Sequence, residues 1–164
     1  MTELAYPRLR APRLDVAGGL AGGVFAGLIG GAAMAIFLML DLEGLRQGSL
    51  SVFAAMAATF LGPRALVAGG GAVVLGVMIH IAFSVGFGVL FSLVVPRRTT
   101  GGPALAYGLT AAALVLVVMT FAILPWADPT LFARVAWFQL SWLFAHVLYG
   151  IGLAFAPVLR RAFG

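Results

Sequence analysis

Residues 16–40 read VAGGLAGGVFAGLIGGAAMAIFLML, an apolar stretch without a charge between Asp15 and Asp41. A helix of about 20 residues crosses the hydrocarbon core of a bilayer, so this stretch is long enough to span one. It is too long for the apolar region of a secretory signal peptide, and no evident cleavage site follows it. We therefore expect a transmembrane helix that is retained as an anchor.

The composition of the whole chain is also typical of a membrane protein. Of its 164 residues 63% are hydrophobic and 9% are charged, whereas a soluble domain carries about 25% charged residues. So short a chain cannot hide that much apolar surface from water, which excludes a soluble, disordered or fibrous protein. The net charge of +5 comes from arginines beside the apolar runs, so we expect the lipid bilayer, and not nucleic acid, as a partner. The absence of cysteine excludes disulfides and thiolate metal sites.

Three further apolar runs cover approximately residues 67–95, 103–126 and 135–159. Together with residues 16–40 they predict an all-α polytopic protein, with residues 1–164 forming one transmembrane domain of four spans. Between the first two spans, residues 49–62 are apolar and helix-prone but too short to cross. They predict a short interfacial or re-entrant helix on the outer side.

Arginine placement predicts the orientation of the four spans. One side of the membrane would hold Arg8, Arg10, Arg13, Arg97, Arg98, Arg160 and Arg161. The opposite side would hold Arg46, Arg64 and Arg134. Because arginine-rich loops stay in the cytoplasm, we expect both termini to be cytoplasmic, in the inner membrane of a prokaryote.

Two of the spans carry the same short motif. Residues 80–88 read HIAFSVGFG and residues 146–154 read HVLYGIGLA, and both spans run on through a proline to an Arg-Arg pair. The first and third spans match more weakly, with Met34 and Phe37 against Met119 and Phe121. This internal repeat predicts two tandem helical hairpins related by a pseudo-two-fold axis along the membrane normal.

His80 and His146 are the two histidines of the chain, and they occupy equivalent positions in the repeat. They precede Arg97 and Arg160 by roughly 25 and 21 Å of helix, so both should lie deep in a bilayer core about 30 Å thick. Ionisable residues at such depth are costly and suggest function. The structural alternative is that each imidazole hydrogen-bonds a backbone carbonyl or a hydroxyl group and ties its helix to a neighbour. Candidate partners are Ser84, Thr110, Thr120, Gln139 and Ser141.

Ligation of a b-type haem or a related tetrapyrrole is the leading functional hypothesis for this pair, because haem iron can take two axial imidazoles from different helices. Small residues at four-residue spacing beside the histidines would let a flat macrocycle approach both helices. The predicted lining consists of Gly76, His80, Ser84, Gly88, Trp142, His146 and Gly150. The histidines would ligate a metal only as ligands of that iron, since zinc needs three or four ligands and the carboxylates lie at the outer helix ends.

A third hypothesis places both histidines on the path of a proton or small solute near the midplane. No catalytic constellation accompanies them, because serine, histidine and carboxylate do not fall at compatible depths in the spans. We therefore expect a protein that is not an enzyme.

Small residues in the first span indicate that this helix packs closely against other helices. Rows of small residues spaced by four let helix backbones approach closely, and glycine costs about 1 kcal/mol relative to alanine inside a helix. The pattern predicts close packing within the bundle or with another subunit. The main row is Gly19, Gly23, Gly27 and Gly31, beside a second row of Gly18, Gly22, Ala26 and Gly30.

The four spans, the histidine motifs, the glycine-rich first helix and the short outer helix resemble the YagU-like group of small four-helix inner-membrane proteins of prokaryotes. The resemblance implies a four-span fold and no particular activity. From the residues we expect a non-enzymatic bundle that serves as a small or accessory subunit of a larger membrane complex, such as one for electron transfer. Its partners would be other membrane subunits or further copies of itself. The alternative is an independent small transporter or channel for a proton or small solute.

Overall fold

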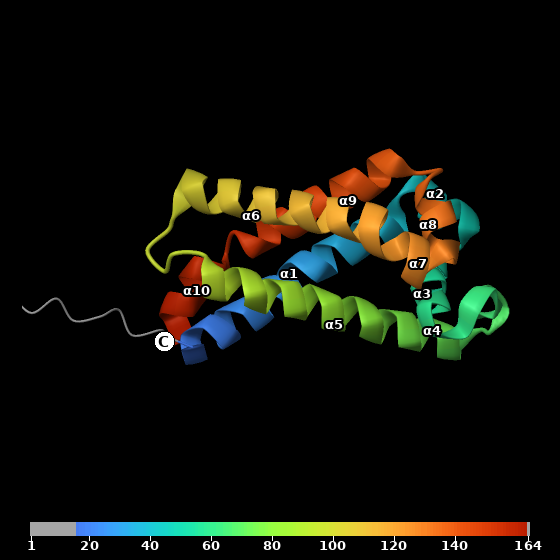
Figure 1. Ribbon diagram of the computed structural model, residues 1–164, viewed down its shortest axis with the longest axis horizontal. Helices are drawn as coiled ribbons and strands as arrows, with labels where there is room; N and C mark the ends of the chain where they lie inside the picture. The colour runs from blue at the N-terminus through green and yellow to red at the C-terminus, as the bar shows by residue number, and fades with distance from the viewer. Residues whose placement is uncertain (1–15, 164) are drawn as a thin grey trace, which may run out of the picture.

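The computed structural model describes residues 16–163, except for the side chains of residues 42 and 43, and every regular element in this part of the chain is a helix (Figure 1). The long helices are α1 (Val16–Leu40), α5 (Gly70–Val94), α6 (Gly101–Val117) and α9 (Gln139–Leu153). The short ones are α2 (Leu42–Gln47), α3 (Ser51–Met56), α4 (Ala58–Leu61), the 3-10 helix η1 (Gly62–Val67), the π-helix η2 (Val118–Ile123), α7 (Leu124–Ala127), α8 (Pro129–Val135) and α10 (Ala156–Phe163).

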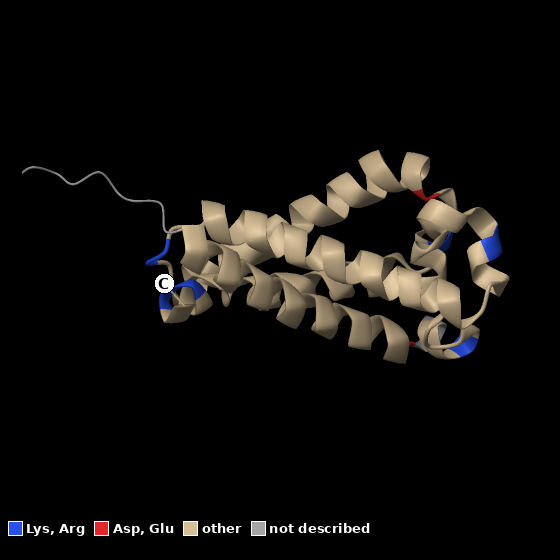
Figure 2. Ribbon diagram, turned by 90° about the horizontal axis from the view of Figure 1, so that it is seen from below, with Lys and Arg blue, Asp and Glu red and all other residues tan. Residues whose placement is uncertain are grey.

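Four stretches of the described chain are long and apolar enough to cross a membrane, as the sequence predicts. They are α1, α5, the continuous stretch Gly101–Ala127 and the stretch Gln139–Phe163. The charged residues drawn in Figure 2 lie at the two ends of the bundle, and its long middle part carries none. Such a distribution keeps charge out of the hydrocarbon core, where it is costly. Arg8, Arg10 and Arg13, whose side of the membrane the sequence predicts, lie outside the described residues.

The last span begins at Gln139 rather than near residue 135, because residues 129–135 form the separate helix α8. Asp128 caps this helix by accepting a hydrogen bond from the Leu131 N–H at 2.9 Å, and Pro129 occupies the first turn, where no N–H is needed. Asp41 caps α2 in the same way at the end of the first span, accepting from the Gly44 N–H at 2.6 Å. The acid at the end of an apolar run thus starts a new short helix.

Helix α1 packs on α5 along one row of small residues and on α9 and α10 along the other. Gly23 and Gly27 press against the backbone of α5. On the other row, a Cβ added at Gly22 or Gly30 would lie 2.7 Å from the Arg160 nitrogen or the Tyr149 carbonyl oxygen, respectively. Both rows are therefore used inside the bundle, with the N-terminal end of α1 beside α10 (Figure 1).

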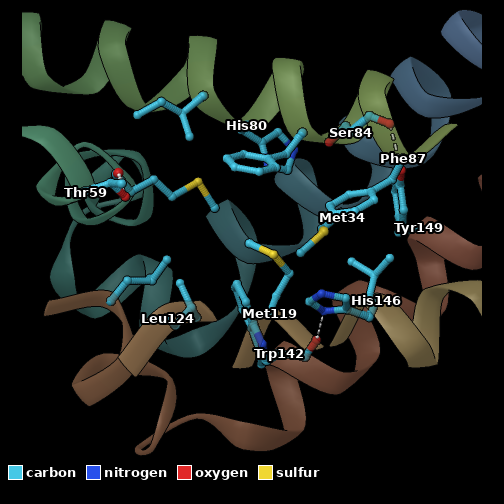
Figure 3. A pocket seen from close by; sticks show the side chains of 15 residues that line it. Met34, Thr59, His80, Ser84, Phe87, Met119, Leu124, Trp142, His146 and Tyr149 are labelled. Carbon is cyan, nitrogen blue, oxygen red and sulfur yellow. Dashed lines mark hydrogen bonds between the residues drawn. The ribbon is translucent and has the colours of Figure 1, made fainter. Parts of the chain in front are cut away.

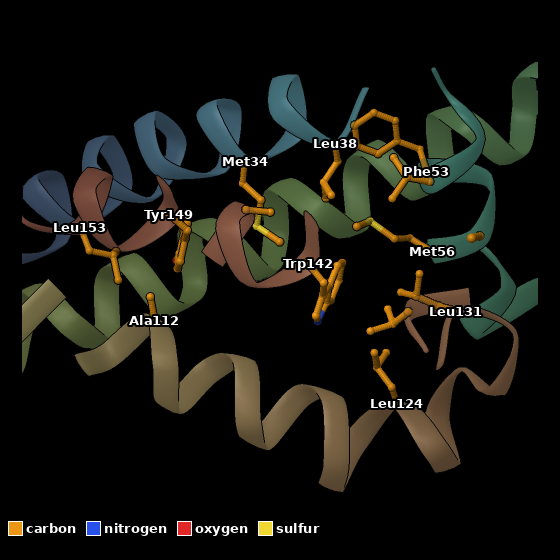
Figure 4. Packing of buried hydrophobic residues seen from close by; sticks show 14 residues of the cluster. Met34, Leu38, Phe53, Met56, Ala112, Leu124, Leu131, Trp142, Tyr149 and Leu153 are labelled. Carbon is orange, nitrogen blue, oxygen red and sulfur yellow. The ribbon is translucent and has the colours of Figure 1, made fainter. Parts of the chain in front are cut away.

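The short apolar segment after α2 packs into the bundle. Residues 52–58 are all buried, and α3 contacts α5 and α8. Gly76 of α5 permits this approach, since a side chain there would collide with the Phe53 carbonyl group. The segment joins a buried apolar cluster that links α1, α3, α8 and α9 at this end (Figure 4).

Helix α6 is attached mainly through α9. Its buried residues Ala104, Gly108 and Ala112 are small, and Gly108 meets the backbone at Gly150. Helix α5 packs instead on α1 and α3, and it makes no comparable contact with α6. The four spans therefore form an open arrangement in which α5 and α6 are the outer helices.

Candidate functional site

A cavity of about 100 Å³ lies among the helices, between the short helices at one end and the close glycine contacts of α1 (Figure 3). All four spans contribute to its wall, together with α3, α4 and α8. The lining residues are Met34, Met56, Thr59, Ile79, His80, Phe83, Ser84, Phe87, Val115, Met119, Leu124, Leu131, Trp142, His146 and Tyr149. Aromatic rings, thioethers and both imidazoles therefore meet in one place.

His80 reaches the cavity from α5 and is partly buried. Its Nε2 lies 2.9 Å from the Gly31 carbonyl oxygen of α1, and its ring meets the ring of Phe53 edge to face at 5.9 Å. A carbonyl oxygen only accepts hydrogen bonds, so Nε2 carries the proton and Nδ1 keeps a lone pair. His80 thus ties α5 to α1 and retains one basic nitrogen.

His146 reaches the cavity from α9 and is 4% exposed. Its Nδ1 lies 2.8 Å from the Trp142 carbonyl oxygen one turn earlier, and the two rings meet at 4.9 Å. By the same reasoning Nδ1 donates the proton and Nε2 keeps the lone pair. This hydrogen bond stays within α9, so it orients the imidazole without joining two helices.

Two buried hydrogen bonds frame the histidines. The Trp142 indole N–H donates to the Thr120 hydroxyl at 3.0 Å, and the Tyr149 hydroxyl donates to the Ser84 carbonyl oxygen at 2.7 Å. Thr120 and its neighbour Met119 belong to the π-helix η2, which widens the third span beside the cavity. π-helical turns within α-helices occur frequently at functional sites.

A polar pair lies beside the cavity at the end formed by the short helices. The Thr59 hydroxyl donates to the Asp128 carboxylate at 2.9 Å, and Asp128 is 1% exposed. Burial raises the pKa of Asp128, while hydrogen bonds from the Leu131 N–H and from Thr59 act in the opposite direction. Nearby, Arg134 donates to the Ser51 carbonyl oxygen at 3.0 Å and so holds α8 to α3.

The structure brings four of the predicted site residues to the cavity: His80, Ser84, Trp142 and His146. Gly76, Gly88 and Gly150 do not line it, because each is pressed against the backbone of another helix. Both imidazoles hydrogen-bond backbone carbonyl groups, one of the kinds of partner that the structural alternative expects, and not one of the side chains named as candidates.

These residues do not fit a haem. Pockets for cofactors and drug-sized molecules measure about 300–1,000 Å³, several times the volume of this cavity. The space beside the glycines that were expected to admit a macrocycle is occupied by the backbones of neighbouring helices. Among the side chains that the structure describes, no three His, Cys, Asp or Glu gather as a metal site, so a zinc-like set is not formed by them either. The space suits an ion or a very small molecule.

Sequence reasoning missed the methionines. Met34, Met56 and Met119 line the cavity, three of the five methionines in the described chain. A signal was available, since Met34 and Met119 are the residues that match between the first and third spans of the repeat. Their meeting with the histidines depends on helix packing, which the repeat does not specify.

The fold and cavity together define a helical bundle suited to crossing a membrane, with an internal site. No family model matches the chain, and no curated protein or solved structure is significantly similar to it. The resemblance to the YagU-like group therefore rests on the sequence motifs alone.

Proposed function

We propose that this chain is a non-enzymatic integral membrane bundle that binds a small passenger in the cavity between His80 and His146, and acts as an independent small transporter. The observation that carries the proposal is the convergence of both histidines on one cavity. Transport sites typically lie near the bilayer midplane between helices of two structural repeats. The volume of about 100 Å³ limits the passenger to an ion or a solute of a few atoms.

The arrangement of the wall supports a binding role over simple structural glue. Of the two histidine hydrogen bonds, that of His80 joins two helices, whereas that of His146 stays within its own helix. A buried polar side chain that contributes no link between helices is costly. Binding a passenger offsets that cost and explains why the imidazole is there.

The proposal includes the finer topology expected from the sequence. The hairpins would be α1 with α5 and α6 with α9, related by a pseudo-two-fold axis, in a prokaryotic inner membrane with both termini in the cytoplasm. In support, Arg97, Arg98 and Arg161 are exposed, and the Arg161 guanidinium of α10 donates to the Arg97 carbonyl oxygen after α5. At the other end α8 and η1 carry Arg134 and Arg64.

Service as an accessory subunit, the other expectation from the sequence, needs a surface that recognises a partner. The exposed apolar residues of the described spans serve equally well against lipid. That role stays a prediction, and co-purification of a larger membrane protein with the tagged chain would support it.

A cysteine-accessibility experiment tests the proposed function without knowledge of the passenger. The chain has no cysteine, so Thr59→Cys and Ser84→Cys each introduce a single thiol, at the end of the cavity near Asp128 and on the α5 wall. A transporter exposes its site to the two sides in turn. We expect a charged thiol reagent to label Thr59→Cys from the side of the short helices and Ser84→Cys from the side of α10.

Met78→Cys is the matched control. Met78 lies on α5 but is 63% exposed on the outside of the bundle, where lipid would shield it from a charged reagent. If Met78→Cys were labelled as strongly as the cavity positions, labelling would not measure access to the cavity, and the expected result would be contradicted. Two results would overturn transport. In one, the reagent labels neither cavity position from any side of the membrane; in the other, it reaches the cavity positions from the same side only.

A further inference from the structure

We propose that the passenger is a soft monovalent metal cation, with Cu(I) as the natural candidate, bound by Met34, Met119 and His146. This inference rests on the proposed function, because it names the chemical class that the cavity accepts. Soft thioether ligands select Cu(I), and imidazole also suits copper. The described chain places three thioethers and both of its imidazoles around one small cavity.

The ligand atoms come from three different spans. Met34 belongs to α1, Met119 to the π-helix η2 and His146 to α9. In Figure 3 the thioether ends of Met34 and Met119 extend into the cavity beside the imidazole of His146. A site assembled from three helices can open or close when the helices move, as release of a cation requires.

His146 has the hydrogen-bonding pattern of a metal ligand. A metal-bound imidazole almost always donates its other ring N–H to a carboxylate, a backbone carbonyl group or water, which fixes the tautomer and orients the ring. The Nδ1–H of His146 donates to the Trp142 carbonyl oxygen at 2.8 Å, leaving the lone pair on Nε2. His80 also lines the cavity, with its Nε2 donating to the Gly31 carbonyl oxygen, but it is not one of the three proposed ligands.

Charge selects a monovalent cation. Thioethers and neutral imidazoles bring no negative charge, and the described side chains form no group of three or more His, Cys, Asp or Glu. The cost of moving an ion into a low-dielectric interior grows with the square of its charge, so such a site disfavours Zn²⁺ and other dications. Phe83, Phe87 and Trp142 add aromatic rings to the wall, which attract a cation further.

Metal binding to the purified full chain in detergent tests the inference. The probes are Cu(I), kept reduced under anaerobic conditions, and Ag(I), a redox-inert soft cation. After desalting against a competing chelator, we expect about one equivalent per chain, and X-ray absorption should show both sulfur and nitrogen neighbours. Zn²⁺ should not be retained.

Variants assign the ligands. Loss of an orienting group outside the ligand set typically weakens metal affinity about 10–100-fold, so loss of direct ligands should cost about 100-fold or more. We expect this for Met34→Leu combined with Met119→Leu and for His146→Leu, while Met78→Leu retains wild-type affinity. Methionine-to-leucine exchange nearly conserves volume, and thermal unfolding of each variant checks that it folds.

Two results would overturn the inference. One is absence of Cu(I) and Ag(I) binding by the wild-type chain, and the other is wild-type affinity in the folded Met34→Leu, Met119→Leu double variant. The latter would mean that the methionines only fill space, as methionine often does in cores. If thiol reagents still reach the cavity from both sides, the proposed transport stands and its passenger belongs to another class. If they do not, both proposals fail.

Discussion

Helices α5 and α9 carry the same histidine motif but occupy different environments. Phe83 of α5 is 48% exposed, whereas Tyr149, at the equivalent position of α9, is 3% exposed and donates a hydrogen bond to the Ser84 carbonyl oxygen. Helix α9 lies between α1 and α6, while α5 lies at the edge of the arrangement. The same sequence motif can therefore occur in a helix inside the bundle and in a helix at its edge, because apolar side chains are stable both in a protein interior and against lipid.

The two histidines show the same contrast. His80 makes its hydrogen bond across helices to Gly31, and His146 makes its bond to Trp142 within α9. The first bond contributes to assembly, and the second only orients a ring. Equivalent residues in a repeated motif therefore need not make equivalent contacts, and the more buried histidine, His146, is the one whose hydrogen bond joins no second helix.

Glycine substitutions should give the largest effect and provide the sharpest test of this contrast. Gly86 and Gly152 are equivalent in the motif, but a Cβ at Gly152 would collide with the backbone of Gly30, whereas no atom lies within 4 Å of one at Gly86. Overpacking typically costs 1–3 kcal/mol, so Gly152→Leu should lower the free energy of unfolding by about 3 kcal/mol. Gly86→Leu is the matched control and should change it little. Similar losses of thermal stability in detergent would contradict the packing of α9 on α1.

Replacing the histidines should give a smaller difference. His80→Leu removes a bond between α5 and α1, and such bonds contribute about 1 kcal/mol in membrane proteins. His146→Leu removes a bond that joins no second helix, so its cost should be less than half as large. Unfolding by detergent titration measures both. A larger loss for His146→Leu would show that this residue is the structural one.

The acids at the ends of the first and third spans extend the comparison. Asp41 and Asp128 each cap the short helix that follows, but Asp128 is almost fully buried and Asp41 is partly exposed. Burial raises the pKa of Asp128 above its ordinary value of 3.8. The folded state therefore favours the neutral acid. The associated stability is complete below about pH 3.8 and is lost as the pH rises through the raised pKa.

The smallest expected effect follows from that pKa. Asp128→Asn cannot ionise, so the wild type should lose stability relative to this variant as the pH rises from 3.8, the ordinary pKa of the group, through its raised pKa. Thr59→Val removes a hydrogen bond that stabilises the carboxylate and should move the wild-type transition to higher pH. Melting temperatures across this range measure both effects. Parallel curves for the wild type and Asp128→Asn would contradict a raised pKa.

Several features could be predicted from the sequence because they depend on local composition. A long uncharged run such as residues 16–40 has few options other than a helix in lipid, since every backbone polar group must be satisfied internally. The π-helix around Met119 and the start of α8 at Pro129 were not predicted. The π-helix lies where the Thr120 hydroxyl accepts from the Trp142 indole N–H, a contact between distant residues. The start of α8 depends on capping by Asp128, which hydropathy does not reveal.

The sequence by itself determined that the chain is helical, that four helices are long and apolar enough to cross a membrane, and that His80 and His146 lie within two of them. Only the tertiary structure decided which helices touch and that methionines share the cavity with the histidines. It also decided that the backbones of other helices pack against Gly76, Gly88 and Gly150. The reason is physical. Hydropathy is a property of each segment, whereas the choice of neighbours depends on small differences in close packing, which in lipid replaces the hydrophobic effect as the main selective force between helices.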